Sequence, residues 1–225
     1  MADVARLREA LRDAGPRGGI DDRLPLLAPM QPLFKGRLRR GAVVAIEGEA
    51  GRSSLAMMML AGVSSAGGWC GVVNVPSFGC LAAHELDIRL EALALVPQAG
   101  AAWADAVGAL VTGMDAVLVA TSAQVSGALA RRLAAKARQH RCTLFTLGPV
   151  WEGSDVRVSV RHQEWVGLGQ GRGRLRSRRL TVVASHRPNA ELVLWLPGED
   201  GRVRTVEDRT TPVGLPTTGR YVRAG

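Results

Sequence analysis

The sequence of 225 residues has few cysteines, few aromatic residues and no long apolar run. Its cysteines, Cys70, Cys80 and Cys142, are scattered and lack Cys-x-x-Cys or Cys/His spacing, which argues against a disulfide framework and a zinc site. No apolar run reaches the roughly 18 residues of a membrane-spanning helix, and the charged N-terminus is unlike a secretory signal. We therefore expect a reduced, cytoplasmic protein with no metal site and no membrane contact.

Lysine is also scarce, although the chain is basic. There are 29 Lys and Arg against 20 Asp and Glu, a formal net charge of +9, and only Lys35 and Lys136 are lysines. This balance favours an anionic partner, either nucleic acid or an acidic protein surface. The hydrophobic content of 47% with 22% charged residues is typical of a globular domain and excludes disorder of the whole chain.

The residue pattern divides the chain into four segments. Residues 1–19 predict an amphipathic helix and a flexible joint. Residues 20–40 are rich in proline and leucine, which predicts an apolar strap without regular elements laid across a domain. Residues 41–197 carry the core, and residues 198–225 are polar and nonperiodic, so we expect a loosely ordered tail.

The N-terminal helix has an apolar face made of Val4, Leu7 and Leu11. This face either packs on the helix's own domain or makes the helix an arm that docks on a partner or on another copy of the chain. The sequence leaves both readings open.

The core segment alternates strands and helices, which is typical of a parallel sheet. After residue 147 the pattern changes to short strands separated by turns, which would extend the sheet antiparallel at one edge. The predicted fold class is therefore α/β, a mostly parallel sheet flanked by helices with antiparallel strands at its C-terminal edge. Strands are expected at 42–46, 70–75, 93–96, 116–120, 143–147, 156–160, 164–168, 180–185 and 192–196, and helices at 53–66, 81–86, 103–110 and 125–140.

A glycine-containing loop follows the first expected strand, where a phosphate-binding loop would lie. The segment Gly48-Glu49-Ala50-Gly51-Arg52-Ser53-Ser54 matches GxxxxGK[ST] only in part, because Ile46 stands at the first glycine position and Arg52 at the lysine. One reading is a glycine turn in which Ser53 caps the next helix. The other is a degenerate nucleotide site.

The order of elements over residues 36–196 resembles the RecA core, with residues 36–41 similar to the segment leading into it. The resemblance implies a fold of the P-loop NTPase type with a degenerate nucleotide site. Arg52 stands at the P-loop lysine, Ala120 at the Walker B aspartate, and Pro76 near the glutamate that activates the attacking water. Losing all three removes charge stabilisation, magnesium binding and water positioning. We expect no enzyme activity and no ATP or magnesium cofactor.

Three further stretches resemble ImuA and its divergent mycobacterial form ImuA-prime, the accessory subunit of the actinobacterial translesion-synthesis mutasome. They are residues 65–70, 130–134 and 165–176. The resemblance implies a part in the damage-induced SOS response and induced mutagenesis, with a polymerase-like adaptor, ImuB, and through it an error-prone replicative-type polymerase as partners. It implies assembly of that complex at the nucleoid rather than chemistry. A weak ATP-dependent switch and an arginine-rich DNA-binding module are the alternatives.

Arginine is concentrated in the C-terminal part of the core. From Arg157 to Arg187 there are eight arginines against the single acid Glu164, and residues 167–179 predict a glycine-rich hairpin turn between two strands. This charge could be solvated, contact DNA phosphates or dock on an acidic adaptor. The candidate contact residues are Arg172, Arg174, Arg176, Arg178 and Arg179 on the turn, with Arg131 and Arg132 on the long helix.

The five tryptophans are expected to be core or strand-packing residues, and Trp151, in a loop, is the best candidate among them for an interface. The four histidines are separated from one another and from carboxylate clusters, so we assign them no catalytic or metal role.

Overall fold

A computed structural model describes residues 22–36, 38–48, 50–149, 151–169, 172–185, 190–198 and 201–206. The expected N-terminal helix, with Val4, Leu7 and Leu11, lies outside these residues. No helix in the described part of the chain is long and apolar enough to cross a bilayer.

One mixed sheet contains the nine named strands of the described residues, in the order β3-β2-β4-β5-β1-β6-β7-β8-β9. The pairs from β3 through β6 are parallel, and the pairs from β6 through β9 are antiparallel. This confirms the predicted class, a mostly parallel α/β sheet with antiparallel strands at its C-terminal edge. The strands are β1 Val43–Glu47, β2 Cys70–Val73, β3 Leu93–Val96, β4 Ala116–Ala120, β5 Thr143–Leu147, β6 Val156–Gly169, β7 Arg172–Ala184, β8 Ala190–Trp195 and β9 Arg204–Thr205.

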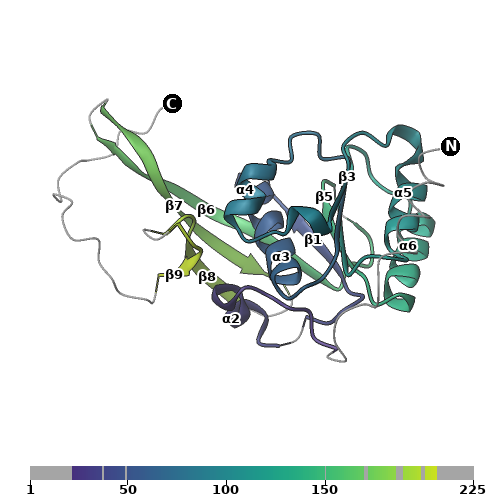
Figure 1. The fold of residues 1–225 in the computed structure, drawn as a ribbon. Coiled ribbons are helices and arrows are strands. Elements are labelled where there is room, and N and C mark those ends of the chain that lie inside the picture. The colour runs from purple at the N-terminus through teal and green to yellow at the C-terminus, as the bar shows by residue number, and fades with distance from the viewer. Residues whose placement is uncertain are drawn as a thin grey trace.

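Helices cover both faces of the parallel half (Figure 1). Consecutive strand residues point to opposite faces, so Val44 packs with α3, whereas Val43 packs with α5 and α6. Each face therefore has its own apolar core. The helices are α3 Arg52–Ser65 and α4 Cys80–Glu85 on one face, α5 Trp103–Leu110 and α6 Gly127–Gln139 on the other, and the short η2 Leu90–Ala92 and η3 Gly100–Ala102.

The proline-rich strap forms two short helices, which corrects the expectation of no regular element. They are η1 Ala28–Met30 and α2 Gln31–Phe34, each with a proline in its first two positions, where a missing N–H costs no helical hydrogen bond. Leu33 and Phe34 are buried, and α2 packs against β7 and β8. The strap also passes close to α3, because a Cβ at Gly62 would lie 2.5 Å from the Cα of Leu26.

The C-terminal strands are longer than the sequence predicted. Residues 156–160 and 164–168 form one strand, β6, because a register shift between Val160 and His162 absorbs the irregularity without ending the ladder. The hairpin predicted at 167–179 is confirmed, because β6 pairs antiparallel with β7, but its turn is shorter than predicted, since residues 167–169 belong to β6 and residues 172–179 to β7. Within the segment expected to be a loose tail, β9 pairs with β8.

Candidate functional site

The loop after β1 is shaped by two glycines in the left-handed region. Gly48 has a φ of 86° and Gly51 a φ of 76°, a conformation that costs glycine little and other residues more. Gly51 is the N-cap residue of α3, and no side chain caps this helix. Ser53 lies inside the first turn of α3 and is exposed, so the predicted cap by Ser53 is wrong.

The cation of the loop is turned back onto the loop itself. The Arg52 guanidinium donates to the carbonyl oxygen of Gly48 over 3.5 Å. Two residues after Arg52, the Ser54 hydroxyl accepts a hydrogen bond from the guanidinium of Arg178, which comes from β7. The side chains of Arg52 and Ser54 are therefore used within the chain, whereas Ser53 is exposed.

Apolar side chains of the antiparallel strands press against the loop. A Cβ at Gly51 would lie 3.2 Å from Cγ2 of Val160 on β6 and 3.4 Å from Cδ2 of Leu180 on β7. Only glycine fits this position without a shift of its neighbours. The space beside the helix N-terminus is thus lined by hydrocarbon on this side.

The other residues of the predicted nucleotide site follow neighbouring strands. Ala120 is the last residue of β4, which is separated from β1 by β5, and Pro76 lies in the exposed turn after β2. Because these strands are parallel, the loop and both residues lie along the same carboxyl edge of the sheet. Neither residue supplies a carboxylate. No group of three His, Cys, Asp or Glu that could hold a metal occurs among the described residues.

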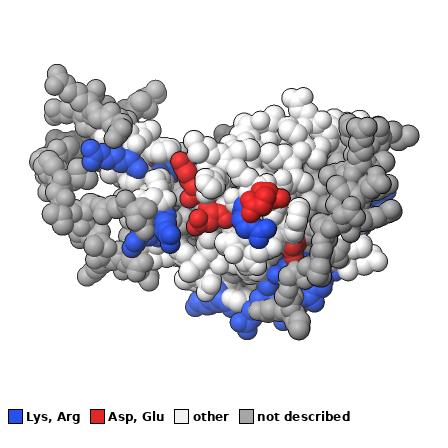
Figure 2. All heavy atoms as spheres, in the orientation of Figure 1, with Lys and Arg blue, Asp and Glu red and all other residues white. Residues whose placement is uncertain are grey.

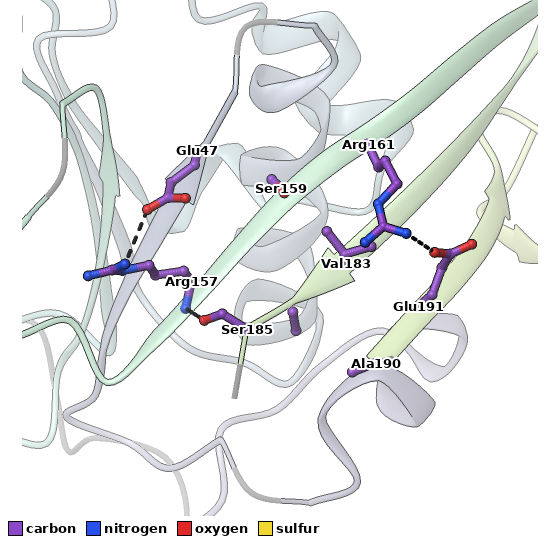
Figure 3. A pocket seen from close by; sticks show the side chains of 9 residues that line it. Glu47, Arg157, Ser159, Arg161, Val183, Ser185, Ala190 and Glu191 are labelled. Carbon is purple, nitrogen blue, oxygen red and sulfur yellow. Dashed lines mark hydrogen bonds and ion pairs between the residues drawn. The ribbon is translucent and has the colours of Figure 1, made fainter. Parts of the chain in front are cut away.

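A polar depression of about 460 Å³ lies on the sheet face opposite α3, at the junction of β1 with the antiparallel strands. Figure 3 shows its two ion pairs, Arg157 with Glu47 at 3.6 Å and Arg161 with Glu191 at 2.7 Å. Each arginine in the lining therefore has a carboxylate partner. This balance gives the depression no strong preference for a ligand of either sign.

The antiparallel strands carry the arginines that the sequence singled out, but they use several of them internally. Arg178 stacks over the Trp165 ring, 4.8 Å from its centroid, and burial lowers the pKa of this guanidinium. Arg179 pairs with Glu164 at 2.5 Å. Arg176 is exposed, with no ion pair among the described residues. The side chains of Arg172 and Arg174 lie outside the described ones.

We call the pair β6 and β7 the ribbon; it extends beyond the helices in Figure 1. Figure 2 shows Lys and Arg over this end of the molecule, with Asp and Glu nearer the centre of the view. The ribbon also exposes two large apolar side chains, Trp165 and Leu175, each 46% accessible. The combination of tryptophan, leucine and arginine on one projecting element is the ribbon's distinguishing chemistry.

Trp151 is not an interface residue, contrary to the expectation. It is 1% exposed and packs edge to face on Trp103, with ring centroids 6.3 Å apart. Burial of the ring in the core beneath α5 and α6 stabilises the loop after β5. The exposed tryptophan is Trp165 instead.

A buried ion pair was not predicted from the sequence. Arg40 and Asp115 are 8% and 4% exposed, and they meet at 2.8 Å, while the other carboxylate oxygen of Asp115 accepts the Trp69 N–H at 2.9 Å. This pair joins the end of the strap to the start of β4. An aspartate directly before an apolar strand was its only signal in the sequence.

The arrangement defines an α/β protein with a glycine-containing loop at the carboxyl edge of a mostly parallel sheet. The family model of the MT3502 N-terminal domain matches residues 32–153, just over half of the chain, and the protein therefore belongs to this family.

A curated relative is an uncharacterized protein of Mycobacterium tuberculosis, Rv3395c, which is 37% identical over 112 residues. The match covers 49% of this chain and 55% of the relative. The chain thus spans about half the length of the curated relative that it matches.

Proposed function

We propose that this protein is a noncatalytic, RecA-like accessory protein of a damage-induced translesion-synthesis complex. In this role it binds a polymerase-like adaptor of the ImuB type and, through it, an error-prone replicative-type polymerase. The observation that carries the proposal is that the chain's own groups occupy the glycine loop. The mycobacterial relative is compatible with a protein of the ImuA type.

A working phosphate loop needs backbone N–H groups and a cation that face the ligand. Here Arg52 instead faces the Gly48 carbonyl, and Arg178 engages Ser54 at the first turn of α3. Val160 and Leu180 line the loop beside Gly51. A nucleotide would have to displace these groups, which argues against ATP binding.

The carboxylates of phosphoryl transfer are also missing at the expected positions. Ala120 ends β4 and Pro76 follows β2, and neither can hold magnesium or orient water. One strand, β5, lies between β1 and β4, so the residues that correspond to a RecA nucleotide site would share the carboxyl edge. This arrangement supports a RecA-like fold without the carboxylates that hold magnesium and orient the attacking water.

The ribbon supports a docking role. Tryptophan and arginine are enriched in the energetic centres of protein interfaces. Trp165 and Leu175 are exposed, and the exposed Arg176 adds positive charge to β7. The ribbon fits an adaptor surface that combines an apolar pocket with acidic groups.

Calorimetry of the full chain with magnesium and ATP, together with a hydrolysis assay, tests the noncatalytic part. We expect no saturable binding and background hydrolysis. Saturable binding that Arg52→Ala removes would contradict the proposal and make the loop a nucleotide switch.

Surface plasmon resonance with an ImuB-type adaptor tests the docking part. The double variant Trp165→Ala with Leu175→Ala should raise the Kd by about 30-fold or more, as expected for an interface hot spot. Leu81→Ala is the matched control, because Leu81 is 72% exposed on α4. Equal binding of all three proteins would exclude the ribbon as the docking element.

A further inference from the structure

The outer face of α6 is a basic surface without apolar anchors. Arg131 and Arg132 are exposed, Lys136 is half-buried, and the exposed residues beside them include Ala128 and Ala135. The opposite side of the helix packs into the core. Small neighbours leave the cations open to close approach by a large, flat ligand.

Cations near the C-terminal end of α6 differ in their pairing. Arg138 pairs with Asp155 at 3.1 Å, and Arg141 pairs with Asp22 at 3.5 Å. Arg131, Arg132 and Lys136 form no ion pair within the described part of the chain. Arg132 and Lys136 are four residues apart on the helix, where like charges destabilise each other. The helix dipole accounts for Lys136, which lies in the last turn of α6, but not for Arg131 and Arg132, which lie earlier in the helix.

Two of these cations line a depression of about 260 Å³ between α5 and α6. Ala104 and Gly108 are the small residues of the lining. A Cβ at Gly108 would lie 3.7 Å from the ammonium nitrogen of Lys136. Asp105 is the one acid in this lining. Glu152 lies beside the first turn of α6, close to Gly127. Three cations thus face two acids, which leaves the surface positive.

We propose that this α6 face, defined as Arg131, Arg132 and Lys136 with the α5–α6 depression, binds the phosphate backbone of nucleic acid without reading its base sequence. Arg132 and Lys136 are about 6 Å apart along the helix axis, and each strand of a duplex carries a phosphate about every 3.4 Å of its axis. Both side chains can therefore meet phosphates of one strand.

The composition of the face favours nucleic acid over protein. Centres of protein interfaces need aromatic or other large apolar side chains, whereas interfaces with nucleic acid are polar and strongly positive. Large exposed hydrophobic residues of the described chain lie elsewhere: Leu81, Leu90, Leu95, Trp165 and Leu175. The α6 face and the ribbon therefore suit different partners.

Fluorescence anisotropy with a short labelled DNA duplex tests this proposal, in two unrelated sequences and over about 50 to 200 mM salt. The triple variant Arg131→Gln, Arg132→Gln, Lys136→Gln should lower the slope of log K against log salt by about 3. The Kd should rise on the order of 100-fold near 0.1 M salt, equally for both sequences.

The matched control is Lys35→Gln, Arg89→Gln, Arg202→Gln, which removes the same charge elsewhere. It should keep most of the affinity, and circular dichroism should show that both triple variants are folded. Three results would overturn the proposal: unchanged binding by the α6 variant, an equal loss in the control, or a larger loss in the single variant Arg176→Gln, which would assign DNA to the ribbon. Competition by polyglutamate as effective as that by DNA would also overturn it, in favour of an acidic protein partner.

Discussion

The two halves of the sheet are built differently, although they share one hydrogen-bonded ladder. In the parallel half, from β3 to β1, helices lie on both faces, and β2 and β5 are buried along their whole length. In the antiparallel half, from β6 to β9, the strap and α3 cover one face. The other face carries charged side chains around an open depression. The parallel half therefore contains an apolar core on each face of the sheet, and the antiparallel half exposes charged and polar side chains on one face.

The family match follows the same division. The matched residues, 32–153, contain β1 to β5 and end before β6 begins. The ribbon, with Trp165 and Leu175, lies beyond them. Similarity to the family thus resides in the half that forms the double core.

The largest effect should come from the buried ion pair of the parallel half. Asp115→Asn leaves the Arg40 guanidinium buried without a carboxylate, which should lower the free energy of unfolding by about 3 to 5 kcal/mol. Urea unfolding measures this change. Asp22→Asn breaks half-exposed pairs with Arg39 and Arg141 and should cost under about 1 kcal/mol. Similar losses in both variants would show that burial does not distinguish these pairs.

Alanine substitutions at two helix glycines should change the stability in opposite directions, because one is limited by packing and the other by helix propensity. Gly62→Ala on α3 should push on the strap backbone at Leu26 and destabilise the protein by about 1 to 3 kcal/mol. Gly108→Ala on α5 meets only ordinary contacts and should stabilise it by about 1 kcal/mol, the usual gain of alanine over glycine. Thermal unfolding reports both signs. If Gly62→Ala were also stabilising, the strap would not be held close to α3.

A surface ion pair of the antiparallel half should matter little to stability. Glu191→Gln removes the partner of Arg161, which is 65% exposed, and the expected loss is within about 1 kcal/mol. Urea unfolding at low and high salt checks it, since screening should remove the difference between variant and parent. A loss as large as that of Asp115→Asn would mean that the open face is more protected than its exposure indicates.

Labelling of the thiols is the smallest perturbation, and it tests the burial of the cysteines without a substitution. Cys80 is exposed, whereas Cys70 and Cys142 are buried. Burial, then the nearby charge of Asp115, raises the pKa of Cys70 from 9.0 to about 12. A thiol reagent at pH 8 should modify Cys80 quickly and the other two only after unfolding. The stability from the protonated Cys70 thiol is complete below pH 9 and is lost as the pH rises toward 12. Rapid reaction of all three thiols would contradict a closed parallel half.

The parallel half was predictable from the sequence in detail. The strands at 93–96, 116–120 and 143–147 and the helix at 103–110 have the bounds that the pattern predicted. Strands buried on both faces are short apolar runs, α5 and α6 show a 3.6-residue period, and α3 is a continuous apolar segment. These signals are local, so a single sequence contains them.

The ribbon was less predictable because its strands have no such signal. Residues 172–179 are mostly arginine, glycine and serine, which favours a turn on local grounds. Pairing with β6 makes them a strand instead. The exposed Trp165 and the buried Trp151 were likewise indistinguishable by residue type.

Some residues of the candidate site could be located from the sequence, whereas their long-range contacts could not. The glycines, Arg52, Ala120 and Pro76 could be located in the sequence, because strand-loop-helix order places them at the ends of successive strands. The contacts of Arg178 with Ser54 and Trp165, and those of Arg40 with Asp115, join residues far apart in the chain.

The sequence by itself determined the class of fold, the buried strands and the excess of arginine, because composition and periodicity are properties of neighbouring residues. Only the tertiary structure decided which cations contact partners within the chain and which remain open. Arg178, Arg179 and Arg138 find partners within the chain, while Arg132 and Lys136 find none among the described residues. The physical reason is that an ion pair depends on a distance of a few ångströms across the fold, and that distance is not recorded in sequence spacing.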